Sequence, residues 1–76
     1  MKYSKIFDKI YTHLVIGYKP NIDGYSIYKD AHMTYSGTEI VDGWEVYDGN
    51  DFCEGSRVFY ADTLKEAKEW IENKVR

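Results

Sequence analysis

Apolar residues near the start of the chain recur at the spacing of a helix. Ser4 is a suitable N-cap, and Gly17 followed by Pro20 is typical of a helix end. We therefore expect a helix over residues 4–16, although the β-branched residues between 12 and 16 would also suit a strand. The residues that would share one stripe of this helix are Ile6, Phe7, Ile10, Tyr11 and Leu14.

The middle of the chain alternates between apolar and polar residues and contains one short motif twice. Residues 22–28 and 41–47 both follow the order aliphatic, Asp, Gly, aromatic, polar, aliphatic, Tyr. Asp-Gly favours a tight turn because glycine accepts positive φ. The pattern predicts strands over 25–29, within 33–41, over 44–48 and over 56–61, with a turn at Asp42-Gly43 and a polar loop over 48–55.

The C-terminal segment has the clearest helix pattern. Thr63-Leu64-Lys65-Glu66 is a capping box, and Leu64, Ala67, Ile71 and Val75 then lie on one face. The sequence predicts a helix over 63–75. The whole chain, residues 1–76, is then one α+β domain in the order α-β-β-β-β-α, an antiparallel sheet of three to four strands flanked by an N-terminal and a C-terminal helix.

Length and composition restrict the class of protein. A chain of 76 residues forms one small domain, and its hydrophobic fraction of 43% is enough for one core. The single cysteine, Cys53, excludes an internal disulfide framework and favours a reducing compartment. No apolar run has the length of a membrane span, and no secretory signal follows the N-terminal lysines. We therefore expect a cytoplasmic protein without membrane contact.

Negative charge is concentrated in the middle of the chain. Residues 21–62 contain nine carboxylates against Lys29 and Arg57, a net charge of −7, whereas the whole chain has a net charge of −3. Such a block repels phosphate backbones and attracts basic surfaces. We expect a protein partner with a basic surface and no direct contact with nucleic acid. The candidate contact carboxylates are Glu39, Asp42, Glu45, Asp48, Asp51 and Glu54.

Strand alternation divides the aromatic residues between two sheet faces. Facing the helices we expect Tyr25, Ile27, Trp44, Val46, Val58 and Tyr60. On the opposite face we expect Tyr28, Tyr47 and Phe59, which are candidate anchors for a protein partner. The alternative is that the N-terminal helix covers this second face. Stacking of RNA bases on it is disfavoured because the surrounding charges are mostly negative.

The sequence predicts no catalytic residues, no cofactor and no metal site. His13 and His32 lack a second ligand at metal-binding spacing, and the carboxylates of residues 48–54 do not have the spacing of a calcium loop. A pair of Cys53 with a histidine would lack a third, orienting group, so we expect Cys53 to be a half-buried thiol. The expected protein is therefore a binding module and not an enzyme.

The stretch Phe59-Tyr-Ala-Asp-Thr-Leu-Lys-Glu-Ala-Lys-Glu-Trp-Ile71 resembles the strand-and-helix ending of many short proteins of phages and mobile elements. In its length, acidic centre and tyrosine content, the chain is similar to anti-CRISPR and other anti-defence inhibitors. This resemblance implies a phage-encoded inhibitor in the cytoplasm of the host cell. As a DNA mimic, it would occupy the basic nucleic-acid-binding site of a CRISPR-Cas-like nuclease or of its nucleic-acid-binding subunit.

Two alternatives remain open at the level of sequence. Asp42-Gly-Trp-Glu-Val-Tyr47 followed by Asp62-Thr-Leu-Lys-Glu-Ala67 resembles HicB-type antitoxins, but Asp51-Phe-Cys-Glu-Gly55 stands where those proteins have a proline-containing loop. The other alternative is a small structural or assembly protein that self-associates, for example as a homodimer, through its tyrosine face. Docking between opposite charges weakens with added salt, whereas apolar self-association does not.

Overall fold

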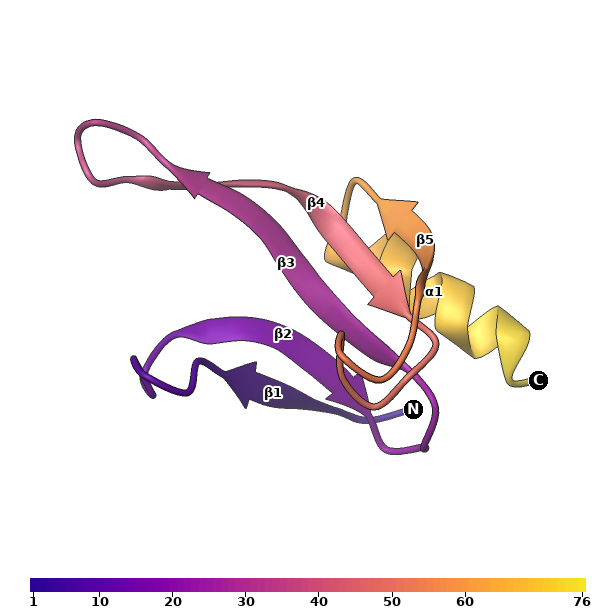
Figure 1. Cartoon of the computed structure of the whole chain (residues 1–76). Coiled ribbons are helices and arrows are strands. Elements are labelled where there is room, and N and C mark those ends of the chain that lie inside the picture. The colour runs from indigo at the N-terminus through magenta and orange to yellow at the C-terminus, as the bar shows by residue number, and fades with distance from the viewer.

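The computed structural model describes all 76 residues and contains five β-strands followed by one α-helix (Figure 1). Each strand pairs antiparallel with the next, so the sheet order is β1-β2-β3-β4-β5. The predicted order α-β-β-β-β-α is wrong, because the sheet has five strands and only the C-terminal helix exists. The elements are β1 Tyr3–Phe7, β2 Val15–Pro20, β3 Ser26–Met33, β4 Glu39–Tyr47, β5 Arg57–Ala61 and α1 Leu64–Lys74.

The segment predicted as a helix over 4–16 forms the β1–β2 hairpin. Tyr3 pairs with Pro20 at one end of the hairpin, and Phe7 pairs with Val15 at the other. Gly17 is a close-approach glycine of β2 and not a helix cap, since a Cβ there would overlap the carbonyl oxygen of Ile27 on β3. Pairing between consecutive strands of the sheet therefore overrides the helical spacing of the apolar residues.

The β3–β4 hairpin turns at a different place from the one predicted. Its turn covers residues 34–38, where Gly37 has a φ of 84°. Asp42-Gly43 instead lies inside β4, beside the bulge at which Gly43 pairs with Asp30 and Val41 with Ala31. The other Asp-Gly pair does form a turn, with Gly24 at a φ of 103° between β2 and β3. The far end of the hairpin projects beyond its neighbouring strands (Figure 1).

The predicted C-terminal helix is confirmed. Thr63 is its N-cap, and the Thr63 hydroxyl accepts a hydrogen bond from the Glu66 amide at 3.2 Å. The helix packs on one face of the sheet, where it shares a small buried core. The buried apolar residues of this core are Ile27, Val46, Ala61, Ala67 and Ile71.

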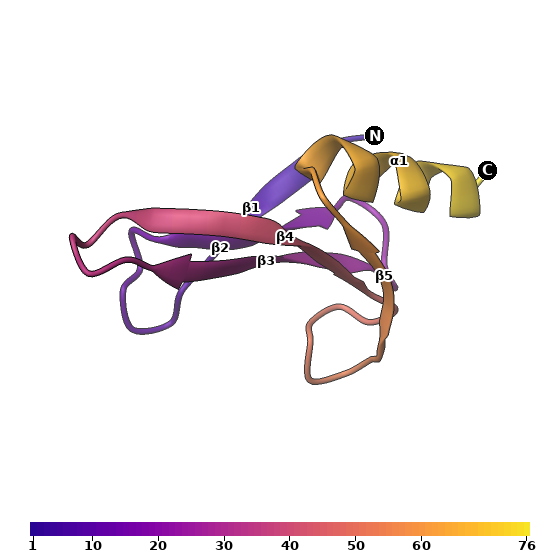
Figure 2. The ribbon, with the colours of Figure 1, turned by 90° about the horizontal axis from the view of Figure 1, so that it is seen from above.

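The two faces of the sheet differ in what lies on them. Figure 2 shows α1 on one side of the sheet and the β1–β2 and β4–β5 loops projecting on the other side. The side of the sheet that α1 leaves free is therefore bordered by two loops, and this arrangement positions the candidate site.

The helix lacks the length and apolar content needed to cross a membrane.

Candidate protein-binding surface

The sheet face turned away from α1 has no helix over it, and we call it the open face. Ile27 and Val46 are buried beneath α1, so the side chains next to them in the strands turn to the opposite side. Pairing then aligns Tyr28 with Glu45 and Glu45 with Tyr60. The polar and aromatic residues of the open face are Tyr28, Asp30, His32, Asp42, Glu45, Tyr47, Arg57 and Tyr60.

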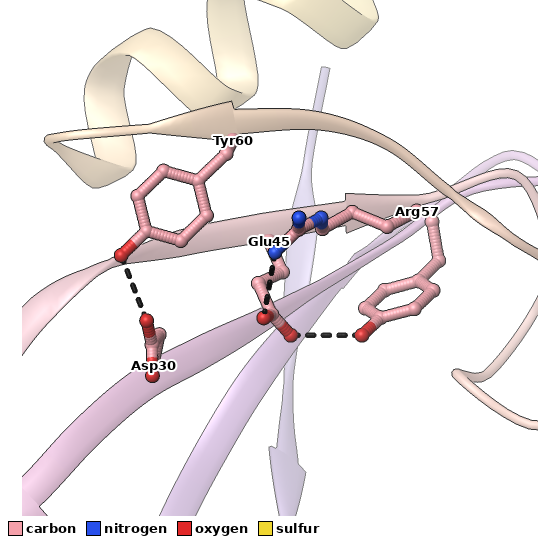
Figure 3. Close-up of polar contacts among 5 residues, drawn as sticks. Asp30, Glu45, Arg57 and Tyr60 are labelled. Carbon is pink, nitrogen blue, oxygen red and sulfur yellow. Dashed lines mark hydrogen bonds and ion pairs between the residues drawn. The ribbon is translucent and has the colours of Figure 1, made fainter.

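Glu45 is the centre of a polar network on the open face (Figure 3). Its Oε2 atom accepts a hydrogen bond from the Tyr47 hydroxyl at 2.8 Å, and its Oε1 atom accepts one from Nη1 of Arg57 at 3.3 Å. About half of the Arg57 side chain is exposed, so this ion pair is screened by water and contributes little to stability. A basic group of a partner can therefore compete for Glu45 at small energetic cost.

Tyr60 connects β5 to β3 across the intervening strand (Figure 3). The Tyr60 hydroxyl donates a hydrogen bond of 2.8 Å to Oδ2 of Asp30. Its ring crosses β4 over Gly43, where any Cβ atom would overlap the ring. Gly43 is thus required for this close approach and not for a positive φ.

Hydrogen bonds to carboxylates raise the pKa of two tyrosines of the open face. The bond to Asp30 is the main cause that raises the pKa of Tyr60 to about 12. The bond to Glu45 is likewise the main cause that raises the pKa of Tyr47. Neutral phenols donate hydrogen bonds and pack against apolar groups, and they are poor nucleophiles at neutral pH.

Three aromatic rings gather at one end of the open face. The Tyr28 ring lies 5.7 Å from the Tyr47 ring and 5.3 Å from the Phe52 ring, in both cases edge to face. The structure thus brings Tyr28 and Tyr47 together on the face opposite the helix, as the alternation predicts. Phe52, from the β4–β5 loop, joins them and is 56% exposed.

The prediction that Phe59 shares this face is wrong. Phe59 points to the helix side, where its ring stacks on Trp70 at 5.3 Å and an interplanar angle of 12°. The reason is the phase of β5, because Ala61 is buried under α1 and Phe59, two residues earlier, must turn the same way. Tyr60 consequently lies on the open face, so the prediction that it faces the helix is also wrong. Val58, predicted to face the helix as well, is the unpaired residue of a bulge.

Two of the predicted contact carboxylates lie on the projecting end of the β3–β4 hairpin. Glu39 forms an ion pair of 2.6 Å with Lys29. Oδ2 of Asp42 lies 2.7 Å from Nδ1 of His32, and this contact is an ion pair only when His32 is protonated. Each pair joins β3 to β4, and both carboxylates are more than 40% exposed. The Lys29 pair reduces the free negative charge at this end of the sheet.

The other predicted carboxylates, apart from Glu45, hold the β4–β5 loop in shape. Asp48 accepts a hydrogen bond from the Ser56 amide at 2.6 Å, and Asp51 accepts one from the Cys53 amide at 2.7 Å. Glu54 accepts one from the Asn50 amide at 3.1 Å. The six predicted carboxylates therefore divide between the hairpin end, the network and the loop.

Sequence reasoning missed several residues of this surface. Asp30, Phe52, Arg57 and Tyr60 were not predicted as contact residues. Phe52 and Arg57 contact the predicted residues Tyr28 and Glu45, and Tyr60 contacts Asp30 and Arg57. For Tyr60 the signal is the alternation of β5, which places Tyr60 on the face opposite Ala61 once Ala61 is taken as a core residue. For Phe52 there was none, since a loop has no periodicity.

No protein-family model, no curated protein and no solved structure matches this chain. No group of three or more His, Cys, Asp or Glu side chains is placed to hold a metal ion. Cys53 is an exposed free thiol, and the expectation that it is half-buried is wrong.

Proposed function

We propose that the protein is a non-catalytic binding module that docks through its open face on a basic protein surface. The observation that carries this proposal is the uncovered sheet face, on which tyrosines alternate with carboxylates. Tyrosine provides a large rigid contact area at low entropic cost, and its hydroxyl forms hydrogen bonds at a wet interface. In the finer form of the proposal, the partner is a defence nuclease or its nucleic-acid-binding subunit, whose basic site the protein occupies.

The distribution of charge supports a basic partner. Asp30, Asp42 and Glu45 lie on the strands of the open face, and the β4–β5 loop adds three more carboxylates on the same side. Arg57 opposes them, and His32 adds a positive charge only when it is protonated. Clustered carboxylates raise the association rate with a basic surface and repel nucleic acid.

The exposed contacts of Arg57 and His32 with carboxylates of the open face can be replaced by contacts with basic groups of a partner protein. Arg57 and His32 each hold one carboxylate of the open face, and both side chains are more than half exposed. Pairs of this kind contribute about 0–1 kcal/mol. An arginine of the partner that forms a bidentate contact with Glu45 would replace the exposed Arg57–Glu45 pair. The new ion pair would be more shielded from water and would have two hydrogen bonds.

The proposal is tested with a charge-reversal variant that spares the loop. Asp48 and Asp51 are unsuitable positions because they hold loop amides. Asp42→Lys combined with Glu45→Lys reverses two charges of the open face, and Glu66→Lys combined with Glu69→Lys does the same on α1. We expect wild type and the α1 variant to capture a nuclease subunit at low salt, with capture lost at high salt and lost in the open-face variant.

Other outcomes of the same experiment contradict the proposal. If the open-face variant retains the partner, the carboxylates do not make the contact. If the protein captures only further copies of itself, and does so at high salt, self-association through apolar surface replaces the proposal.

A further inference from the structure

An apolar groove lies beside the open face, between the two projecting loops. Its volume is about 290 Å³, and seven of its ten lining residues are apolar. The strands contribute Ile6, Ile16 and Tyr28, the β1–β2 loop contributes Ile10, and the β4–β5 loop contributes Phe52. Ligand pockets for whole small molecules measure about 300–1,000 Å³, so this groove has the size for one or two side chains.

Hydrogen bonds hold the β1–β2 wall of the groove in place. Oδ1 of Asp8 accepts bonds from the amides of Ile10 at 2.8 Å and Tyr11 at 2.9 Å, and the Asp8 amide donates to the carbonyl of Leu14 at 2.9 Å. These bonds form a local turn that fixes the chain on both sides of Ile10.

The β4–β5 wall is fixed in the same manner. Oδ1 of Asp51 accepts bonds from the amides of Cys53 and Glu54 at 2.7 and 3.0 Å, which hold the backbone on both sides of Phe52. Oδ1 of Asn50 accepts bonds of 3.0 Å from Lys19 and from the Gly24 amide, which join this loop to the rest of the sheet. Both walls are thus ordered before any partner binds, and this lowers the entropic cost of binding.

The rim of the groove is mainly negative. Asp8 and Asp51 line it, and the only cationic lining residue is Lys9. The bonds from the Tyr11 and Ile10 amides hold the pKa of Asp8 below its ordinary value. Like any aspartate of ordinary pKa, this carboxylate is ionised at neutral pH. Burial is the main cause that raises the pKa of Tyr28, and the charges of the β4–β5 loop raise it further.

We infer that the groove receives an apolar side chain from a lysine- or arginine-rich amphipathic helix of the partner protein. The apolar lining accepts a leucine-sized side chain, and the carboxylates of the rim pair with basic residues that flank it on the helix. The inference rests on the proposed function and adds an anchor point to it. Ile10 supports this role because it is exposed together with Phe7 and Phe52, and these three apolar side chains line the same groove.

The test uses a short amidated peptide with leucines at i, i+3, i+4 and i+7 and lysines between them. One control peptide replaces the lysines by glutamates, and another replaces the leucines by alanines. Titrated into the ¹⁵N-labelled protein, the lysine–leucine peptide is expected to shift the amide signals of Ile6, Ile10 and Phe52 most. Each control peptide is expected to bind at least about tenfold more weakly.

A pair of matched variants localises the contact. Ile10→Ser removes an apolar group from the groove wall, and Ile40→Ser removes one from the projecting hairpin, where Ile40 is 43% exposed. We expect Ile10→Ser to weaken peptide binding about fivefold or more and Ile40→Ser to leave it unchanged. Equal effects of the two variants overturn the assignment of the groove.

The remaining outcomes separate this inference from the proposed function. If the lysine–leucine peptide does not bind, or if the glutamate peptide binds equally well, the inference is wrong. If the peptide shifts only Asp30 and Glu45, the groove is not the anchor, although the open face still binds a basic partner. If the peptide binds in the groove but charge reversal at Asp42 and Glu45 leaves partner capture unchanged, the inference stands and the electrostatic part of the proposed function fails.

Discussion

The Tyr60 hydroxyl donates a 2.8 Å hydrogen bond to the carboxylate of Asp30, a residue two strands away. The contact joins β3 and β5 directly over β4, and it is made on the open face (Figure 3). It depends on the absence of a side chain at Gly43, because the ring occupies the place of a Cβ atom there. One glycine thus determines the position of a tyrosine of the candidate surface.

The substitution Gly43→Ala tests this dependence. The added methyl group displaces the Tyr60 ring, so the bond to Asp30 is lost and the pKa of Tyr60 falls from about 12 toward the ordinary value of about 10. Ultraviolet titration of the tyrosines, with Tyr60→Phe to identify the signal, measures the change. An unchanged Tyr60 pKa in Gly43→Ala would show that the ring does not need this glycine.

Stability at high pH depends on Tyr3. Burial, the bond of its hydroxyl to Glu72 and the charge of Glu72 raise the pKa of Tyr3 to about 12. Between pH 10 and 12 the unfolded chain therefore loses a proton that the folded chain keeps, and the free energy of unfolding falls as the pH rises. The stabilisation is fully present below pH 10.

We expect Tyr3→Phe to make the loss of stability between pH 10 and 12 less steep. Urea denaturation at several pH values gives the slope. Tyr35→Phe is the matched control, since Tyr35 lies fully exposed at the turn of the β3–β4 hairpin. The same slope in wild type and in Tyr3→Phe would exclude this residue as the source.

The parts of the fold that could be predicted are those fixed by local chemistry. The helix begins directly after its N-cap Thr63, because the Thr63 hydroxyl accepts a hydrogen bond from the Glu66 amide, which is an interaction within one turn. The turn at Gly24 follows from positive φ, which glycine accepts without strain. Both features depend only on neighbouring residues, and both are present in the structure.

The parts that could not be predicted depend on distant contacts. Ile6, Phe7 and Ile10 have helical spacing, but β1 is fixed by pairing with β2 and by the contact of Tyr3 with Glu72 of the helix. Asp42-Gly43 has the same two residues as the turn at Asp23-Gly24, yet it lies inside β4 because its neighbours pair with β3. For the candidate site, an error of one residue in the phase of β5 exchanges Phe59 and Tyr60 between faces.

The N-cap of the helix provides a local test of stability. Thr63→Ala removes the side-chain acceptor for the Glu66 amide and is expected to lower the free energy of unfolding by about 1 kcal/mol. Thr12→Ala, in the exposed β1–β2 loop, is the control and should have little effect. Chemical denaturation measures both. Equal values for the two variants would mean that the cap does not stabilise the helix.

Phe59 and Phe52 allow the two faces of the sheet to be distinguished by experiment. Phe59 packs on Trp70 and contacts the core, so Phe59→Ala is expected to cost about 2–3 kcal/mol, a large part of the stability of a small domain. Phe52 is 56% exposed, so Phe52→Ala should cost well under half as much and should act mainly on partner binding. Thermal unfolding and the peptide titration separate the two effects. If Phe59→Ala were as stable as wild type and defective in binding, Phe59 would belong to the open face and the observed phase of β5 would be wrong.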